Sequence, residues 1–192
     1  MVASLKTETD KIILGIDPGT RILGFGVIHV KGRKASYVDM GVLNLKNEKD
    51  HFVTLKKITT EVLALIEKFM PDELAIEAPF YGKNPQVMLK LGRAQGAAIA
   101  AALMRDIPVF EYAPRSVKLA VTGKGSASKE QVAVLVQKLL GICSPQKYAD
   151  ATDALSIAMC HFYHRTALGP VAGKREDSWE SFVKNNPDKV KK

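Results

Sequence analysis

The sequence has little cysteine and no long hydrophobic run. Its two cysteines, Cys143 and Cys160, do not form a CxxC pair, which excludes a disulfide-stapled fold and a zinc site made of cysteines. The longest uncharged, largely apolar stretch covers residues 96–104, far short of the roughly 20 residues that a membrane helix needs. The first eleven residues are polar, so we expect no secretory signal. These absences predict a soluble, cytoplasmic protein with no membrane partner.

Acidic residues are fewer than basic ones. The 192 residues include 28 Lys and Arg and 20 Asp and Glu, a formal net charge of +8. Residues 166–192 contribute only +2, so the rest of the chain carries +6. This excess is compatible with an acidic partner such as nucleic acid, although a merely soluble basic surface would give the same count.

The order of predicted elements indicates an α/β domain of ordinary size. Residues 11–30 predict two strands joined at Pro18-Gly19, and residues 35–45 complete an antiparallel meander. Gly24 and Gly26 in the second strand indicate either close approach of another backbone or a bulge. The later predicted strands cover residues 74–77 and 108–112, and the predicted helices cover residues 55–69, 86–105 and 115–121, the segment after Ser128, and residues 149–164. We therefore expect a mixed sheet flanked by helices.

Four acidic residues lie where apolar ones are expected. Asp17 ends the string ILGID, Glu77 ends LAIE, and Asp150 and Asp153 lie in YADATDALSIAM. A charge beside a core costs several kcal/mol unless it is paired or binds a metal. Taken singly, Asp17 could cap a turn and Asp150 could cap a helix.

Taken together, the four carboxylates predict a metal site. Asp150 and Asp153 are three residues apart on a predicted helix and share one face, about 5–6 Å apart. Asp17 and Glu77 end strands that we expect to be neighbours. Ligands with oxygen alone favour Mg²⁺ or Mn²⁺. Two such ions about 3.5–4 Å apart can activate a water and stabilise the leaving oxygen of a phosphodiester.

A basic segment accompanies the acidic residues. Arg115, Lys118, Lys124 and Lys129 fall within fifteen positions. The loop at Lys124 leads into a capped helix start, whose free N–H groups favour a phosphate. A solvated surface face would give the same pattern. The segment lacks the spacing of a Walker A loop, which argues against nucleotide binding there.

Four segments strongly resemble the RuvC family of Holliday-junction resolvases: GIDPGTRILGFGVI, LAIEAPFYGKNPQVMLKLGRAQG, VFEYAPRSVKLAVTGKGSASKEQV and YADATDALSIAMCH. The resemblance implies a ribonuclease-H-like fold with the meander and parallel strands in one sheet. It also implies a homodimer that makes paired nicks across four-way DNA junctions in recombination and repair, with the branch-migration complex RuvA–RuvB as a further partner. The RuvC-like nuclease domain would span residues 11–165, between an extension at 1–10, expected to be disordered, and a polar tail at 166–192.

The resemblance also implies roles for single residues. Asp17 would bridge two Mg²⁺ ions, which Mn²⁺ could replace, and Glu77, Asp150 and Asp153 would complete the ligand set. Phe80 matches an aromatic residue that stacks on a junction base, and Lys118 and Lys129 match DNA-contacting lysines. Position and charge extend the predicted DNA-binding set to Tyr81, Lys83, Arg115 and Lys124, although Tyr81 could equally anchor its loop.

Three other functions compete with junction cleavage. A related ribonuclease-H-like enzyme could act on RNA. The string GIDPGT also occurs in actin-like ATPases, but that fold needs two such domains and this chain is too short for them. A non-catalytic junction binder would have no need of the intact acidic set. His161 lies roughly 12 Å along the helix from Asp153, so we expect it to be structural. The small residues of helix 86–105 could pack on the sheet or form a dimer interface.

Overall fold

The computed structural model describes residues 10–48, 50–79, 84–142 and 149–167. None of the helices in these ranges is both long enough and apolar enough to cross a membrane. The described strands are β1 (Asp10–Asp17), β2 (Ile22–Lys31), β3 (Lys34–Asn44), β4 (Glu73–Glu77) and β5 (Val109–Tyr112). The described helices are α1 (His51–Phe69), α2 (Pro85–Leu103), α3 (Pro114–Thr122), α4 (Lys129–Leu139) and α5 (Ala149–Ala167).

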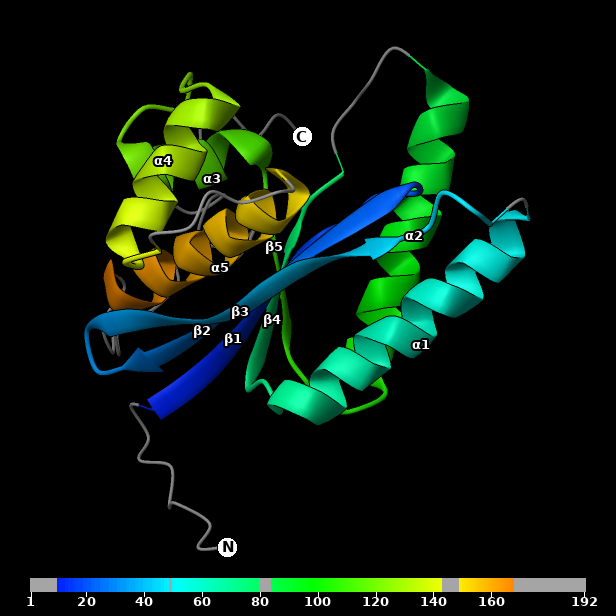
Figure 1. Ribbon diagram of the computed structural model, residues 1–192, viewed down its shortest axis with the longest axis horizontal. Helices are drawn as coiled ribbons and strands as arrows, with labels where there is room; N and C mark the ends of the chain where they lie inside the picture. The colour runs from blue at the N-terminus through cyan, green and yellow to red at the C-terminus, as the bar shows by residue number, and fades with distance from the viewer. Residues whose placement is uncertain (1–9, 49, 80–83, 143–148, 168–192) are drawn as a thin grey trace, which may run out of the picture.

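One mixed sheet organises the chain, in the order β3-β2-β1-β4-β5. The first three strands are antiparallel neighbours, whereas β4 runs parallel to both β1 and β5. The predicted meander followed by parallel strands is therefore confirmed. Because β1 and β4 are parallel neighbours, their carboxyl ends lie at the same edge of the sheet (Figure 1).

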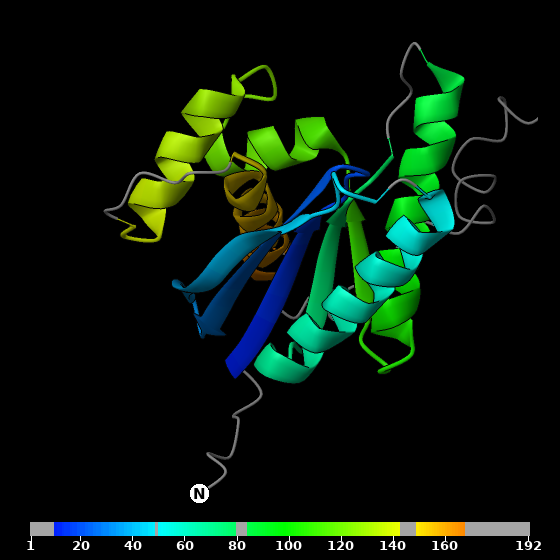
Figure 2. The same cartoon turned by 45° about the vertical axis from the view of Figure 1, so that its right-hand side comes forward.

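Helices cover both faces of the sheet. Helices α1 and α2 lie on one face of the sheet. Helix α5 packs directly on the other face, and α3 and α4 pack against α5 (Figures 1 and 2). The apolar stripe predicted for α1 is buried, including Ile58, Val62 and Ile66. Helix α1 ends at the left-handed residue Met70, directly before Pro71. It begins four residues earlier than its apolar pattern predicts, because Asp50 caps it by accepting from the N–H groups of Phe52 and Val53.

Glycines let α5 rest directly on the backbone of β1 and β2. A methyl group at Gly15 would overlap the carbonyl oxygen of Ala154, and one at Gly24 would overlap that of Asp150. A methyl group at Gly26 would come within 2.6 Å of the Leu155 nitrogen. The close approach predicted from the glycines of β2 is confirmed, and the ladder to β3 also shifts register between Val27 and Ile28. The contact at Gly24 fixes where the start of α5 lies relative to the end of β1.

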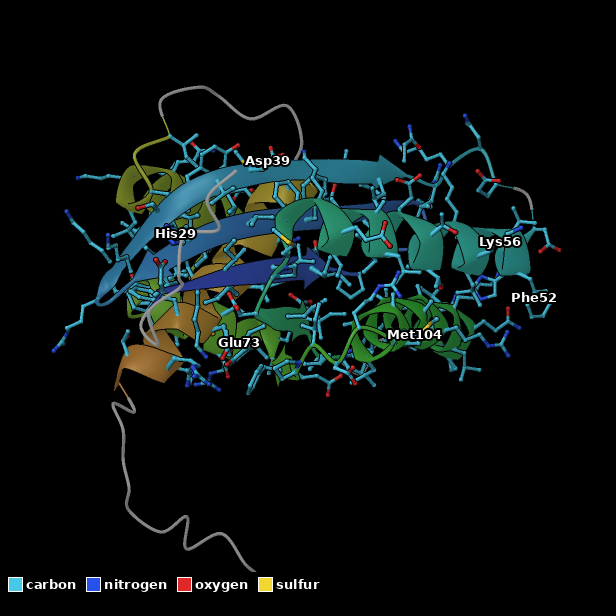
Figure 3. The ribbon with its side chains drawn as sticks, turned by 90° about the horizontal axis from the view of Figure 1, so that it is seen from below. His29, Asp39, Phe52, Lys56, Glu73 and Met104 are labelled. Atoms are coloured by element: carbon cyan, nitrogen blue, oxygen red, sulfur yellow. The ribbon has the colours of Figure 1, made fainter. Side chains whose placement is uncertain are left out.

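A buried polar network fixes the other end of α5. The Glu73 carboxylate lies 2.6 Å from Lys11 Nζ, 2.8 Å from His161 Nε2 and 3.1 Å from an Arg165 nitrogen, near the carboxyl-terminal part of α5 (Figure 3). The Tyr112 hydroxyl lies 2.7 Å from His161 Nδ1. Burial acts to raise the pKa of Glu73, but hydrogen bonds from His161 and Lys11 outweigh it and lower the pKa to about 2. His161 is thus structural, as expected, and it joins α5 to β4 and β5.

Replacing Glu73 by Gln should lower the free energy of unfolding by about 2–4 kcal/mol near neutral pH, since it leaves buried donors and cations without their anion. The folded-state pKa of about 2 lies below the ordinary 4.5. The carboxylate therefore stabilises the fold fully above about pH 5 and progressively less as the pH falls toward 2. Urea unfolding of both proteins at several pH values measures this difference.

The matched control is Glu67→Gln, because Glu67 pairs with Arg105 at 2.6 Å but both side chains are largely exposed. That change should cost less than about 1 kcal/mol at any pH. A Glu73→Gln effect as small as the control's, or one that does not change with pH, would contradict the role assigned to the network.

A side chain at Gly24 should push α5 away from β1. We expect Gly24→Ala to lower the free energy of unfolding by about 2 kcal/mol or more. The new methyl group would clash with the backbone of Asp150, which cannot rotate away as a side chain can. Gly32→Ala is the control: Gly32 has open space around it but a φ of +60°, so only about 1 kcal/mol of backbone strain is expected. Chemical denaturation measures the free energy of unfolding of both variants. Equal losses would show that α5 can shift to accommodate a side chain at Gly24.

Candidate active site

Asp17 and Glu77 lie side by side at one edge of the sheet. The register pairs Ile16 with Ile76 in the parallel ladder, so the next residue of each strand is one of these two acids. Both are half-buried. On its other side, Asp17 pairs with Gly24 of β2, the residue on which the Asp150 backbone rests. The four predicted carboxylates therefore lie where the ends of β1 and β4 meet the first turns of α5.

Burial and neighbouring acids affect the ionisation of Asp17 and Glu77. Burial raises the pKa of Asp17 to about 8, with further contributions from Glu77 and Asp153 and a smaller one from Asp150. Burial also raises the pKa of Glu77, again with a contribution from Asp153. Lys129 acts against both shifts. Burial and the neighbouring acids thus oppose the ionisation of Asp17 and Glu77, and a positive ligand would favour their charged forms.

Lys129 forms an ion pair with one of the four carboxylates. It is the first residue of α4, whose start is fixed by the predicted capping box between Ser128 and Gln131. Its ammonium lies 2.7 Å from Asp153 Oδ2, and this hydrogen bond raises the pKa of Lys129. Sequence reasoning assigned Lys129 to DNA binding alone and did not anticipate this contact.

The chemistry of the donors fits a hard divalent cation, but the oxygens are not gathered into a cage. Within the described ranges, no group of three or more His, Cys, Asp or Glu side chains lies close enough to hold an ion. The sequence led us to expect closer convergence. One of the four carboxylates, Asp153, is paired with Lys129 instead. Asp17, Glu77, Asp150 and Asp153 are the residues that could hold a metal.

Gln95 holds the backbone beneath Glu77. This buried side chain of α2 donates to the Glu77 carbonyl oxygen at 3.0 Å and to Glu111 Oε1 at 2.8 Å. Just beyond the strand, the Ala78 N–H donates to the Tyr112 carbonyl oxygen at 2.9 Å. Sequence reasoning did not single out Gln95. The available signal was one amide residue on the otherwise small, apolar buried stripe of α2.

The predicted DNA-binding residues are only partly described. Phe80, Tyr81 and Lys83 lie outside the described residues. Arg115 and Lys124 are exposed and Lys118 is half-buried, on α3 and on the loop between α3 and α4. Lys118 lies near enough to Glu77 to lower its pKa, so this basic segment borders the carboxylates.

An open groove of about 470 Å³ borders the carboxylates as well. Arg21 and Lys46 supply its cations, and neither forms an ion pair within the part of the chain that the structure describes. Its lining also includes Leu91 of α2 and, next to the other carboxylates, Asp150. Sequence reasoning missed this groove, because its residues are scattered along the chain: Gly19, Thr20, Arg21, Ile22, Lys46, Leu91 and Asp150.

Comparisons with known proteins show the family to which the chain belongs. The family described as "Crossover junction endodeoxyribonuclease RuvC" matches residues 13–161. The protein of that name from Christiangramia forsetii is 52% identical over 186 residues, covering 96% of this chain and 95% of its own. The one from Porphyromonas gingivalis is 51% identical over 187 residues, covering 95% of this chain and 98% of its own.

A solved structure extends the likeness to the fold. The structure of Thermus thermophilus RuvC in complex with a Holliday junction substrate is 34% identical, with a TM-score of 0.77, and the match covers 82% of this chain and 96% of that one. Most of this sequence matches RuvC proteins along nearly their full length. The chain therefore belongs to the RuvC family of crossover junction endodeoxyribonucleases.

Proposed function

We propose that this protein resolves four-way DNA junctions by hydrolysing one phosphodiester in each of two symmetry-related strands, in homologous recombination and DNA repair. The observation that carries the proposal is the meeting of Asp17, Glu77, Asp150 and Asp153 at one edge of the sheet. Basic residues border this edge on both the α3–α4 side and the α2 side. A cluster of carboxylates between two basic surfaces suits a substrate with a phosphate backbone and a metal as cofactor.

RuvC-family nucleases depend on metal ions, and the finer assignment is part of our proposal. Asp17, Glu77, Asp150 and Asp153 would hold two Mg²⁺ ions, with Mn²⁺ as a possible replacement. When bound, such ions activate a water and stabilise the leaving oxygen of a phosphodiester. Asp17 lies next to Glu77 in the sheet and opposite Gly24, on which the Asp150 backbone rests. Gln95 keeps the Glu77 backbone in place and so orients its carboxylate.

The DNA would be bound on both sides of the carboxylates. Lys118 and Lys124 on one side, and Arg21 and Lys46 on the other, are positioned to neutralise phosphates along a strand that crosses the site. The segment of Phe80, Tyr81 and Lys83 directly follows Glu77 in sequence, and we propose that it contacts the bases at the junction. An enzyme that cuts RNA would share the carboxylates, so the choice of substrate depends on these surrounding contacts.

Symmetric cleavage calls for two active sites related by a two-fold axis, and we propose a homodimer. Buried alanines on α2, such as Ala94 and Ala98, pack on the sheet. The rest of the helix leaves Val87 and Leu89 exposed and the space around Gly92 open, a surface that a second copy could cover. We also propose that the protein acts in the cytoplasm with the RuvA–RuvB branch-migration complex.

Replacing Asp17 by Asn should abolish cleavage of a labelled immobile junction in Mg²⁺ while leaving junction binding largely intact. The wild-type protein should nick the junction but not a linear duplex, and should do so only with Mg²⁺. In EDTA the variant's free energy of unfolding should also exceed that of the wild-type protein by about 1–3 kcal/mol. The substitution removes a carboxyl group whose ionisation is opposed by burial and by the neighbouring acids. Gel assays and thermal melts measure these effects.

Asp39→Asn provides the control, since Asp39 of β3 forms a surface ion pair with Lys68 of α1. It should retain activity and gain no stability. If Asp17→Asn nicked the junction at the wild-type rate, the proposed chemistry would be wrong. Preferential cleavage of an RNA strand by the wild-type protein would instead favour the ribonuclease alternative.

Removing Arg21 or Lys46 should weaken junction binding through lost phosphate contacts. Each alanine substitution should reduce the slope of log K against log salt by about 0.9, the value for one phosphate neutralised on duplex DNA. Fluorescence anisotropy in EDTA at several salt concentrations gives the slope. Lys34→Ala should leave it unchanged, because Lys34 is exposed at the start of β3 and lies at the opposite end of the β2–β3 ladder from the groove residue Ile22. Equal slopes for all four proteins would exclude the groove from the DNA path.

A further inference from the structure

The ion pair between Lys129 and Asp153 joins two groups that differ in exposure. The Lys129 side chain is 69% exposed, whereas that of Asp153 is 18% exposed. Their charged atoms nevertheless lie 2.7 Å apart. The capping box anchors the backbone at Lys129, so the long side chain alone reaches into the site. Lys129 can leave Asp153 by rotating into solvent, with no movement of the backbone.

Among the described residues, Lys129 is the one cation that pairs with any of the four carboxylates. Lys118 affects Glu77 through space but forms no ion pair with it in these ranges. The ammonium therefore supplies positive charge directly at one of the four carboxylates. A metal ion that uses Asp153 as a ligand must compete with it directly.

We propose that Lys129 is the resident counter-ion of the DNA-free site and that a DNA phosphate removes it from Asp153, so that junction binding and metal binding strengthen each other. The inference rests on the proposed function and concerns only how its two ligands are coupled. With the ammonium on a phosphate, both Asp153 oxygens are free for a cation. With the ammonium on Asp153, a cation must first displace it. Linkage requires the coupling to be reciprocal: metal at Asp153 also releases Lys129 toward DNA.

The first test measures Mn²⁺ binding to the DNA-free protein by calorimetry at constant ionic strength. Lys129→Met keeps most of the side chain's apolar length but removes the competing charge, and it should bind Mn²⁺ about tenfold more tightly than wild type, the scale of a partly buried ion pair. Lys138→Met is the matched control, because Lys138 is exposed on the same helix and away from the carboxylates. It should change the affinity less than about twofold, which is the general effect of losing one surface charge.

The second test measures the coupling itself. Junction affinity is determined by anisotropy in EDTA and in Ca²⁺, and gels confirm that the recovered DNA is intact. In the wild-type protein, Ca²⁺ should tighten junction binding by a factor that is reduced severalfold in Lys129→Met. Lys129→Met should also bind the junction more weakly in EDTA, but the ratio between the two conditions is independent of that loss. Lys129→Gln provides a second variant if the methionine variant fails to fold by circular dichroism.

Two negative results separate the inference from the function on which it rests. Equal Mn²⁺ affinities for wild type, Lys129→Met and Lys138→Met would overturn the counter-ion role while leaving the proposed nuclease intact. The same conclusion follows if the ratio between Ca²⁺ and EDTA is the same in wild type and variant. Failure of the wild-type protein to bind Mn²⁺ at all would instead contradict the metal site, and this inference would fall with it.

Discussion

The direct contact of α5 with the backbone of β1 and β2 is the constraint on which the site depends. An ordinary helix is held away from a sheet by the side chains that pack between them. Here glycines at 15, 24 and 26 remove the side chains that would keep the helix away. This approach brings the start of α5 to the end of β1, so that two carboxylates on a helix join two at strand ends. Oxygen ligands of one ion must lie within about 2–3 Å of it, so a standard spacing would leave α5 too far away.

The two ends of α5 lie beside carboxylates whose pKa values are shifted in opposite directions. Near its carboxyl end, Glu73 is surrounded by cations and hydrogen-bond donors, which lower its pKa to about 2. Near its amino end, Asp17 lies among other acids, and burial with their repulsion raises its pKa to about 8. One carboxylate stabilises the fold and the other opposes it. The network at Glu73 joins α5 to β1, β4 and β5, the same elements that repulsion at the active-site end would push apart. Stability and function are thus placed at opposite ends of one helix.

Most of the fold was predictable because its signals are local. Apolar periodicity and caps gave the helices, and the β-branched runs gave the strands. The start of α1 was missed because its first turn is mostly polar or exposed and its signal is the single cap at Asp50. The acids of the site stood out as charges in apolar strings. Glu73 did not, because its burial depends on Lys11, His161 and Arg165, which are far from it in sequence.

The partners of the carboxylates were harder to predict for a related reason. Arg21, Lys46 and Gln95 reach the site from separate segments, and no local pattern distinguishes them from ordinary surface or helix residues. Lys129 was singled out for its charge, but the sequence could not reveal that its ammonium forms an ion pair with Asp153. Whether a lysine is free for DNA depends on which anion lies nearest, and that depends on how far α4 and α5 stand apart.

The arrangement of charge also explains why metal and DNA would be expected to arrive together. Bound alone, a phosphate backbone would bring more negative charge to a site where Asp17 and Glu77 already resist ionisation. Bound alone, a divalent ion would have to displace Lys129 from Asp153 and leave that ammonium without its ion pair. When both bind, the ion neutralises the carboxylates and the lysine moves to the phosphate, so each charge gains a partner of opposite sign. The net charge of +8 attracts DNA to the surface in general, whereas this exchange of partners acts only where the carboxylates lie.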